Sequence, residues 1–345
     1  MKMNSLLLKR YDEERYTIIF SQNTGFFARV EDENTVEPVY STHGPELLDI
    51  SITNYCERSC SFCYRASSKN GKEMSFADYE YILKQARDCG VLQVALGGGN
   101  PNQHSSFERI LEVTREKYNI VPSYTTNGDG LSDRILAASK KHCGAVAISF
   151  YEPETLFYSN LNKLIDAGIK TNVHFVLSAS TLDSAIEFLS RGIQKVSGVN
   201  ALIFLLFKPA GKGNQSDILR KSSDTEYFFS LISDSKVKIG FDSCCVPGLV
   251  NQLQYNPVSV EACEAGCFSA FVSEDLMFYP CSFMQNKVDG INLRNISILD
   301  AWQNVVLFRN MRNKNGSEKC KTCLHLSVCK GGCSVFKEIN LCEYH

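Results

Sequence analysis

Residues 47–65 read LLDISITNYCERSCSFCYR and decide how the rest of the chain is interpreted. The first seven residues form a short apolar run rich in isoleucine and leucine, which predicts a buried β-strand. The loop after it carries Cys56, Cys60 and Cys63, in the spacing Cys-x3-Cys-x2-Cys. Three thiolates on one loop can hold three irons of a [4Fe-4S] cube and leave the fourth iron open to a small molecule.

Two other interpretations of this triplet are a zinc site and buried cysteines that bind nothing. Structural zinc normally takes four protein ligands, and neither a histidine nor a fourth cysteine lies near the triplet in sequence. The spacing therefore favours an iron-sulfur cluster.

The bulk composition supports a metal-binding role. The chain has 15 cysteines in 345 residues and shows no export signal, so a disulfide scaffold is a poor explanation. With 36 basic and 38 acidic residues it has no charge excess that favours nucleic acid or an anionic membrane surface. No uncharged apolar run approaches the ~18 residues of a membrane span. We therefore expect a cytoplasmic protein that binds neither nucleic acid nor membrane.

Short β-rich runs alternate with helical segments beyond residue 46. Amphipathic spacing predicts helices at 75–90, with Ser75 and Asp78 as a capping box, and at 105–117, opened by Ser105 and Glu108. Apolar rather than alternating strands imply a parallel sheet buried on both faces, and six such units make an α/β fold: a partial (β/α)6 TIM-like barrel with its site at the carboxyl ends of the strands. The predicted strands are 47–53, 91–96, 120–126, 145–150, 170–178 and 201–207.

Three regions follow from this pattern. Residues 1–45 are predicted to form an N-terminal extension with a hairpin around SQNTG at 21–25. Residues 46–235 form the partial barrel. Residues 236–345 form a small cysteine-rich auxiliary-cluster domain with one helix at 298–313.

The motif Cys-x3-Cys-x-Phe-Cys after the first strand resembles the radical S-adenosylmethionine (SAM) superfamily, and the resemblance covers roughly residues 45 to 215. It implies that the open iron binds SAM and that a 5'-deoxyadenosyl radical removes a hydrogen atom from a substrate. Asn100 stands where the family usually has Glu. The SAM contacts implied by the resemblance are Phe62, Tyr64, Gly98, Gly99, Asn100, Pro101, Thr126, Asn127, Ser149 and Asn172. His174, Asn172 and Lys208 are expected to point toward the same cavity or to be satisfied structural polar groups.

A second cysteine array lies near the C-terminus, with the core Cys-x2-Cys-x5-Cys-x3-Cys from residue 320 to 333. Its eight thiolates are enough for two closed four-cysteine sites. The array and the preceding Trp302 helix resemble the SPASM domain, although Leu276 stands where that family has glycine. Two zinc sites are the alternative. The resemblance implies three [4Fe-4S] clusters in all, with Cys263, Cys267, Cys281 and Cys333 on auxiliary cluster I and Cys320, Cys323, Cys329 and Cys342 on auxiliary cluster II.

Four cysteines remain outside these sets. Cys89 and Cys143 each precede a glycine and are expected to be packing residues. Cys244 and Cys245 could donate a hydrogen atom to a substrate radical, which makes them candidate catalytic residues, or could ligate auxiliary cluster I in place of Cys263.

Enzymes of this architecture mostly act on peptides, so the resemblance implies modification of a ribosomal peptide by crosslinking, thioether formation or epimerisation, with a flavodoxin- or ferredoxin-type reductant. The first 45 residues are too short for a winged-helix leader-binding module, so recognition would use the hairpin or a separate protein. The alternatives are a small-molecule radical SAM dehydrogenase, a sulfatase-type maturase and a non-catalytic iron-sulfur electron carrier. Ser282 stands where the sulfatase branch has its Asp base, which counts against that branch. The sequence does not predict an oligomeric state.

Overall fold

The computed structural model describes most of the chain. It covers residues 6–151, 154–196, 198–233, 235–253, 260–313 and 316–342. Within these ranges no helix has the length and apolar content needed to cross a membrane.

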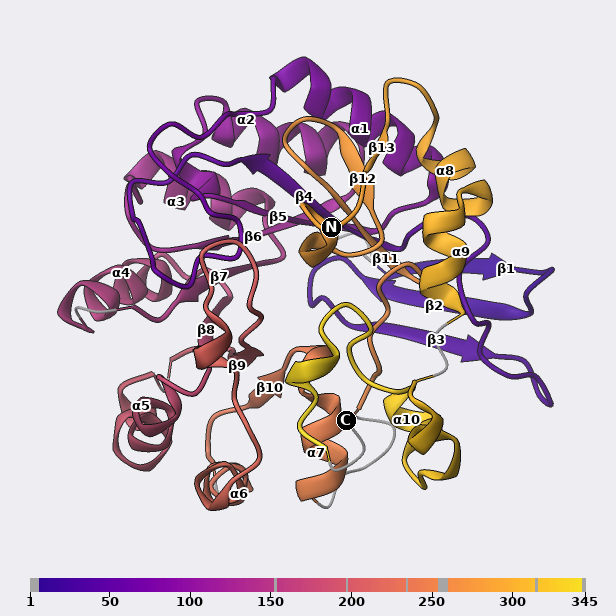
Figure 1. Cartoon of the computed structure of the whole chain (residues 1–345). Coiled ribbons are helices and arrows are strands. Elements are labelled where there is room, and N and C mark those ends of the chain that lie inside the picture. The colour runs from indigo at the N-terminus through magenta and orange to yellow at the C-terminus, as the bar shows by residue number, and fades with distance from the viewer. Residues whose placement is uncertain are drawn as a thin grey trace.

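A ten-stranded sheet forms the centre of the fold, in the order β10-β9-β8-β7-β6-β5-β4-β11-β12-β13. The run from β4 to β10 is parallel throughout, and Figure 1 shows it as an arc with helices outside. This is the predicted partial TIM-like barrel, and all six predicted strands are present. The strands are β4 (Leu47–Thr53), β5 (Gln93–Gly98), β6 (Val121–Thr126), β7 (Ala145–Ser149), β8 (Thr171–Leu177), β9 (Ala201–Leu206), β10 (Ile239–Phe241), β11 (Ser269–Val272), β12 (Met277–Tyr279) and β13 (Ile291–Asn292).

The C-terminal region shares this sheet. Strand β11 pairs in parallel with β4, and β12 and β13 follow as antiparallel neighbours. The sheet therefore continues across the boundary expected near residue 235.

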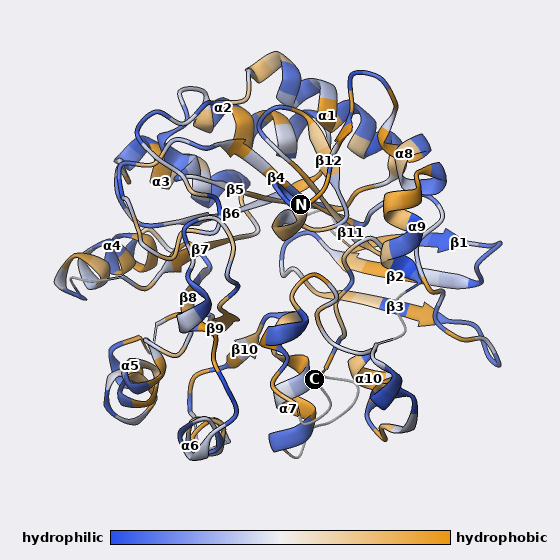
Figure 2. Ribbon diagram, viewed as in Figure 1, coloured by the Kyte–Doolittle hydropathy of each residue, from blue (hydrophilic) through white to orange (hydrophobic). Residues whose placement is uncertain are grey.

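Helices cover the outer face of the arc, and in Figure 2 they alternate between hydrophobic and hydrophilic residues, as helices with one buried face do. In chain order, the helices of the described ranges are α1 (Phe76–Cys89), α2 (Phe107–Glu112, followed by a π-helical turn Val113–Lys117), α3 (Asp133–His142), α4 (Glu154–Asp166), α5 (Leu182–Glu187), α6 (Ser223–Ser230), α7 (Val246–Gln252), α8 (Ile298–Asn304), α9 (Val306–Arg312) and α10 (Leu326–Cys329), of which α7 to α10 belong to the C-terminal region.

The two faces of β4 differ in polarity, which corrects the expectation of apolar rather than alternating strands. On β4 the outward residues Leu48, Ile50 and Ile52 are fully buried in the core beneath the helices. The side chains between them point into the barrel and are small or polar. Asp49 is level with Ala95 and Ser123 across three strands. The interior therefore offers polar groups rather than a second apolar layer.

The N-terminal extension is a three-stranded antiparallel sheet of β1 (Leu6–Tyr11), β2 (Tyr16–Ser21) and β3 (Phe27–Glu31). The predicted hairpin is confirmed as β2–β3, and β1 was not predicted. Its buried face packs on Leu92 and Val121, just before and at the start of β5 and β6. This sheet lies at the amino ends of the barrel strands, opposite the end that carries the cysteine loop (Figure 1).

Three helix predictions need correction. Ser75 caps α1 by accepting a hydrogen bond from the Asp78 backbone N–H (3.1 Å), but the Asp78 carboxylate pairs with Arg294 instead of completing a capping box. Helix α2 begins after Ser106, and the Ser105 hydroxyl instead donates to Glu73 (2.7 Å).

The segment 298–313 is two helices, because Val305 has extended backbone angles. Trp302 and Phe308 are both fully buried with ring centroids 5.2 Å apart. Six residues along one straight helix would place them about 120° apart around the axis. The break lets both rings face the core.

Candidate active site and cysteine clusters

The loop after β4 brings Cys56, Cys60 and Cys63 together at the carboxyl end of the barrel. All three are half-buried. Burial raises the pKa of the Cys56 and Cys60 thiols, and the neighbouring thiols raise it further. A group of close thiols that resist ionisation as free acids gains most from a metal that stabilises the thiolates.

The loop after β9 fixes the far end of this cysteine loop. The Lys212 backbone N–H donates to the Cys63 carbonyl (3.0 Å), and Lys212 Nζ donates to the Ser59 hydroxyl (3.0 Å). A Cβ atom on Gly211, which has φ +60°, would lie 2.4 Å from the carbonyl oxygens of Cys63 and Tyr64. Glycine is therefore required for this close approach.

The glycines after β5 pack against the start of the cysteine loop. Cβ atoms on Gly98 and Gly99 would lie 2.0 Å from the Thr53 carbonyl oxygen and 1.9 Å from that of Tyr55. A Cβ on Gly97, by contrast, would meet no atom within 4 Å. The segment thus combines a tight contact with the loop and open space on the barrel side.

Side chains of the β5 and β6 exits form one hydrogen-bonded group beside Cys56. Asn100 is buried, and its Oδ1 accepts from the Thr126 hydroxyl (3.0 Å) and the Asn127 backbone N–H (3.2 Å). Asn127 Nδ2 in turn donates to Cys56 Sγ (3.6 Å). The Asn100 side chain therefore shapes the site. Pro101 is buried at the start of the following 3-10 turn.

Arg58, Asp129 and Tyr151 also belong to this site, and motif reasoning missed all three. Arg58 forms a two-pronged ion pair with Asp129, with N–O distances of 2.6 and 2.7 Å. Tyr151 stacks on Phe62 with centroids 5.8 Å apart and lies 5.4 Å from the Arg58 guanidinium carbon. Burial raises the pKa of Tyr151. The available signal was position, because Tyr151 follows Ser149 at the end of β7.

The barrel interior below the loop contains groups without partners. Asp49 has no hydrogen bond or ion pair to any other described residue, and burial raises its pKa to about 6. His174 is level with Ser149, its buried Nδ1 has no partner within the described ranges, and burial lowers its pKa to about 4. Asn172 lies one step deeper and accepts a hydrogen bond from Asn200 (2.8 Å).

Lys208, at the exit of β9, forms an ion pair with Asp242. Burial by itself lowers the pKa of Lys208, but the Asp242 carboxylate more than reverses this and raises it. Lys208 is therefore a paired structural cation.

The four cysteines expected on auxiliary cluster II come together. Together with Val250 and Leu326 they line one pocket near α7 and α10. Burial raises the pKa of Cys329 to about 11, and the backbone N–H groups of Gly331 and Gly332 act against that rise. The pocket cysteines are Cys320, Cys323, Cys329 and Cys342.

The region expected for auxiliary cluster I contains an additional thiol. Cys281 lies near Cys263 and Cys333, and burial raises its pKa to about 12. The Cys244 thiol is hydrogen-bonded to Cys333 and lowers the pKa of Cys333. Cys267 lies close to Arg312.

Cys245 differs from its neighbour Cys244. It is fully buried beside Asp242, and burial raises its pKa. The two adjacent cysteines therefore do not act as a pair: Cys244 faces the cysteine group and Cys245 faces the core. Over the described ranges, no three Cys, His, Asp or Glu side chains stand close enough to share a single metal ion. The thiolates of a cubane stand farther apart, with one at each iron.

Comparison with known proteins agrees with this arrangement. Residues 50–189 match the model of the radical SAM superfamily. The chain is 22% identical to the mycofactocin maturase MftC of Mycolicibacterium smegmatis, across 85% of this chain and 79% of that protein. It is 21% identical to the PqqA peptide cyclase of Xanthomonas euvesicatoria, across 82% and 81%.

A solved structure shares the fold over nearly the whole chain. It is Streptococcus suis SuiB bound to its precursor peptide SuiA, with a TM-score of 0.74, 16% identity, and coverage of 99% of this chain and 98% of that one. Members of the superfamily bind SAM and a [4Fe-4S] cluster. The chain thus carries a radical SAM domain at residues 50–189, and it is an enzyme.

Proposed function

We propose that Cys56, Cys60 and Cys63 hold a [4Fe-4S] cluster with one open iron and that the enzyme modifies a ribosomal peptide. The observation that carries this proposal is three thiols on one loop at the carboxyl end of a barrel whose interior beneath Gly97 is open. The Asn127 amide beside Cys56 fits a thiolate sulfur, because a hydrogen-bond donor stabilises negative charge there.

The polar exits of β5 to β7 fit a nucleoside with a charged amino-acid end. Ser149 and Asn127 supply hydrogen-bonding groups, and the stacked rings of Phe62 and Tyr151 supply a flat apolar surface. The further proposed SAM-contacting residues are Tyr64, Gly98, Gly99, Asn100, Pro101, Thr126 and Asn172. When bound, the cluster and SAM supply a 5'-deoxyadenosyl radical, which removes a hydrogen atom from the substrate.

The protein's own residues exclude water and hold the reacting groups in place. The ring pair of Phe62 and Tyr151 shields one side of the cysteine loop, and Arg58 paired with Asp129 closes the gap beside it. The unpartnered side chains of Asp49 and His174 are available to a substrate group that enters the barrel.

Two auxiliary [4Fe-4S] clusters complete the proposal, which makes three clusters in all. The pocket near α7 supports Cys320, Cys323, Cys329 and Cys342 as the ligands of auxiliary cluster II. For auxiliary cluster I we propose Cys263, Cys267, Cys281 and Cys333. Cys244 is an alternative ligand, because it already contacts Cys333.

A peptide substrate is supported by two kinds of relative. The sequence relatives are named as a maturase and a peptide cyclase, and SuiB was solved with a precursor peptide. A small-molecule substrate is the second candidate. We further propose a cytoplasmic location and a flavodoxin- or ferredoxin-type electron donor. The division at residues 45 and 235 also stays a proposal.

The chemistry is tested with anaerobically reconstituted protein, dithionite and SAM. Wild-type protein is expected to form 5'-deoxyadenosine, and the variant Cys56→Ala/Cys60→Ala/Cys63→Ala to form none. The variant Cys89→Ala is the control, because Cys89 is the buried last residue of α1, away from the loop. Wild-type protein that contains iron and forms no 5'-deoxyadenosine would refute the proposal. The substrate class is tested by adding peptides encoded by neighbouring short reading frames and measuring a mass change that requires SAM.

A further inference from the structure

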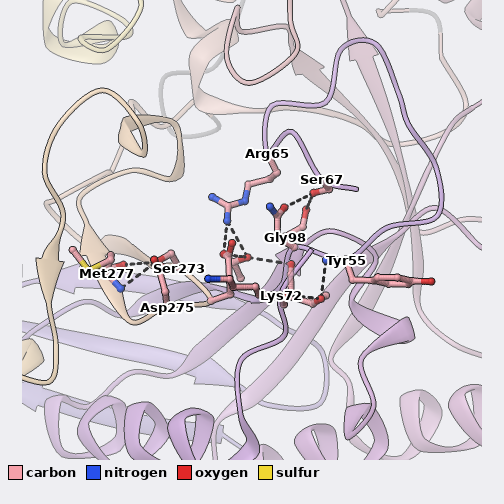
Figure 3. A network of polar contacts seen from close by, with 12 residues as sticks. Tyr55, Arg65, Ser67, Lys72, Gly98, Ser273, Asp275 and Met277 are labelled. Carbon is pink, nitrogen blue, oxygen red and sulfur yellow. Dashed lines mark hydrogen bonds and ion pairs between the residues drawn. The ribbon is translucent and has the colours of Figure 1, made fainter. Parts of the chain in front are cut away.

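The cysteine loop is joined to the C-terminal region by a charged contact inside the barrel (Figure 3). Arg65, two residues after Cys63, points its guanidinium toward the hairpin formed by β11 and β12 (269–279). Its Nη2 donates to Glu274 Oε2 (2.5 Å) and to the Ser51 hydroxyl (3.2 Å). Ser51 Oγ also donates to the same Glu274 oxygen (2.9 Å). One carboxylate therefore joins the loop, the first barrel strand and the hairpin.

This contact is shielded from water. The Arg65 side chain is 3% exposed and the Glu274 side chain 11% exposed. The guanidinium carbon lies 5.2 Å from the centre of the Phe271 ring. An ion pair in such surroundings is weakly screened, and either charge left alone there is strongly disfavoured.

The hairpin turn presents Glu274 in a fixed position. Figure 3 shows the Ser273 side chain held within the turn. Its hydroxyl accepts from the Met277 N–H (3.0 Å) and donates to Asp275 (2.5 Å). Leu276 has a φ of +65°, a conformation that side chains rarely adopt unless their surroundings impose it. The turn is thus held by its own bonds, independently of Arg65.

The segment that carries Arg65 is bound on both sides. The Ala66 N–H donates to the Cys63 carbonyl (3.0 Å), and the Ser67 hydroxyl donates to Asn54 (2.6 Å). The Tyr64 ring contacts Phe283, two residues after Cys281, with centroids 4.7 Å apart. Tyr64 and Arg65, which directly follow Cys63, therefore both contact the segment 274–283. This segment contains Cys281, a proposed ligand of auxiliary cluster I.

We propose that Glu274 is a positioning residue for SAM cleavage. By holding Arg65, the hairpin fixes the Cys63 end of the loop. It thereby sets the position of the cluster relative to SAM. This inference rests on the proposed function of the cysteine loop. It assigns the C-terminal region a role at the catalytic cluster in addition to its own cysteines.

The test compares Glu274→Gln with Asp78→Asn. Asp78 on α1 pairs with Arg294 (2.7 Å), so Asp78→Asn also breaks an ion pair between the C-terminal region and the barrel, but on the exposed outer side. Both proteins are reconstituted and assayed for 5'-deoxyadenosine without any substrate. We expect Glu274→Gln to lower the rate at least tenfold with unchanged iron content, and Asp78→Asn to stay within twofold of wild type.

Two further readouts separate positioning from general stability. In Glu274→Gln, the change that SAM produces in the electron paramagnetic resonance spectrum of the reduced cluster is expected to be altered. In cluster-free protein, amides of residues 54–67 are expected to exchange hydrogen faster than in wild type or Asp78→Asn. If Glu274→Gln does not fold, Arg65→Lys, which keeps the charge and loses the geometry, takes its place in all three assays.

The outcomes are distinct. A wild-type rate, spectrum and exchange pattern in Glu274→Gln would overturn the positioning role and leave the proposed function intact. Equal losses in Glu274→Gln and Asp78→Asn would overturn it too, because they would show a general effect of loosening the C-terminal region. Failure of the wild-type protein to cleave SAM would remove the proposed function itself, and the inference with it.

Discussion

The cysteine loop and the C-terminal cysteine array both bring thiols close together, but they do so in opposite ways. In the loop, three thiols lie within residues 56–63 and backbone bonds to neighbouring segments hold them in place. In the array, residues between Cys263 and Cys342 are collected from separate turns and short helices, and Cys244 joins from outside the expected set. The first site is encoded locally, whereas the second exists only after the chain has folded around it.

The difference matters for what a mutation does. Ordering a short loop costs less chain entropy than bringing together distant segments. Loss of a thiol from the loop should therefore affect chemistry first, and loss of a thiol from the array should affect folding and iron content as well. Four predictions follow this contrast.

The largest effect is expected from Cys63→Ala. We predict that 5'-deoxyadenosine formation falls by at least about a thousandfold, or about 4 kcal/mol of barrier, since one iron of the proposed cluster would lose its only protein ligand. The comparison variant Cys329→Ala is predicted to retain SAM cleavage within about tenfold of wild type. Product chromatography measures both. Equal losses would erase the functional distinction between the two regions.

The second prediction separates Cys333 from its neighbours. Cys333→Ala is expected to lose about four irons per chain, whereas Cys244→Ala keeps them if it is the additional thiol. Cys245→Ala is expected to keep its iron and lose about 1–3 kcal/mol of stability, because it leaves a cavity in the core. Iron analysis and thermal unfolding distinguish these outcomes. Iron loss in Cys244→Ala would move this residue into the ligand set.

The third prediction concerns the barrel interior between the two regions. Burial raises the pKa of Asp49 to about 6, whereas an unfolded Asp titrates near pH ~4. The folded protein therefore binds this proton more tightly. The resulting stabilisation is complete below about pH 4 and is lost as the pH rises through about 6.

Asp49→Asn cannot ionise, so it is expected to exceed wild type in stability above pH 7 by about 1–3 kcal/mol, with no difference near pH 4. The lower end of this range allows for the part of the Asp49 side chain that stays accessible to water. Denaturant unfolding at the two pH values measures this, and Asp183→Asn on α5 is the control. A difference that does not change with pH would contradict the shifted pKa.

The smallest effect is expected at Arg58 and Asp129. Their side chains are 19% and 22% exposed, so Asp129→Asn should cost only about 1 kcal/mol of stability. We expect SAM cleavage to be several-fold slower, since the Arg58 guanidinium also lies over the Tyr151 ring. A comparison of rate with melting temperature decides whether this pair supports the loop locally, and an unchanged rate would exclude it from the site.

The sequence predicted the six barrel strands because each is a short apolar run between polar loops. The polar interior was missed because β4 was interpreted as an apolar run, although Asp49, Ser51 and Thr53 alternate with Leu48, Ile50 and Ile52 along it. The division of 298–313 into two helices depends on where Trp302 and Phe308 find the core, which no local pattern specifies.

The candidate site shows the same limit. The cysteine triplet stood out by its spacing, and the residues at the strand ends were proposed only through the resemblance to the radical SAM superfamily. Arg58, Asp129 and Tyr151 were not, because they meet only when three separate loops converge. Cys244 was noted beside Cys245, and the sequence could not say which of the two faces the other cysteines.

The parallel pairing of β11 with β4 has a consequence for the chain as a whole. Without it, the first barrel strand would present a row of unpaired backbone groups, the kind of edge on which proteins aggregate. The cysteine-rich C-terminal region is therefore not a unit that can be removed from the barrel. A chain cut near residue 260 should be insoluble rather than merely simpler, and grafting this region onto another barrel would require a matching strand to receive it.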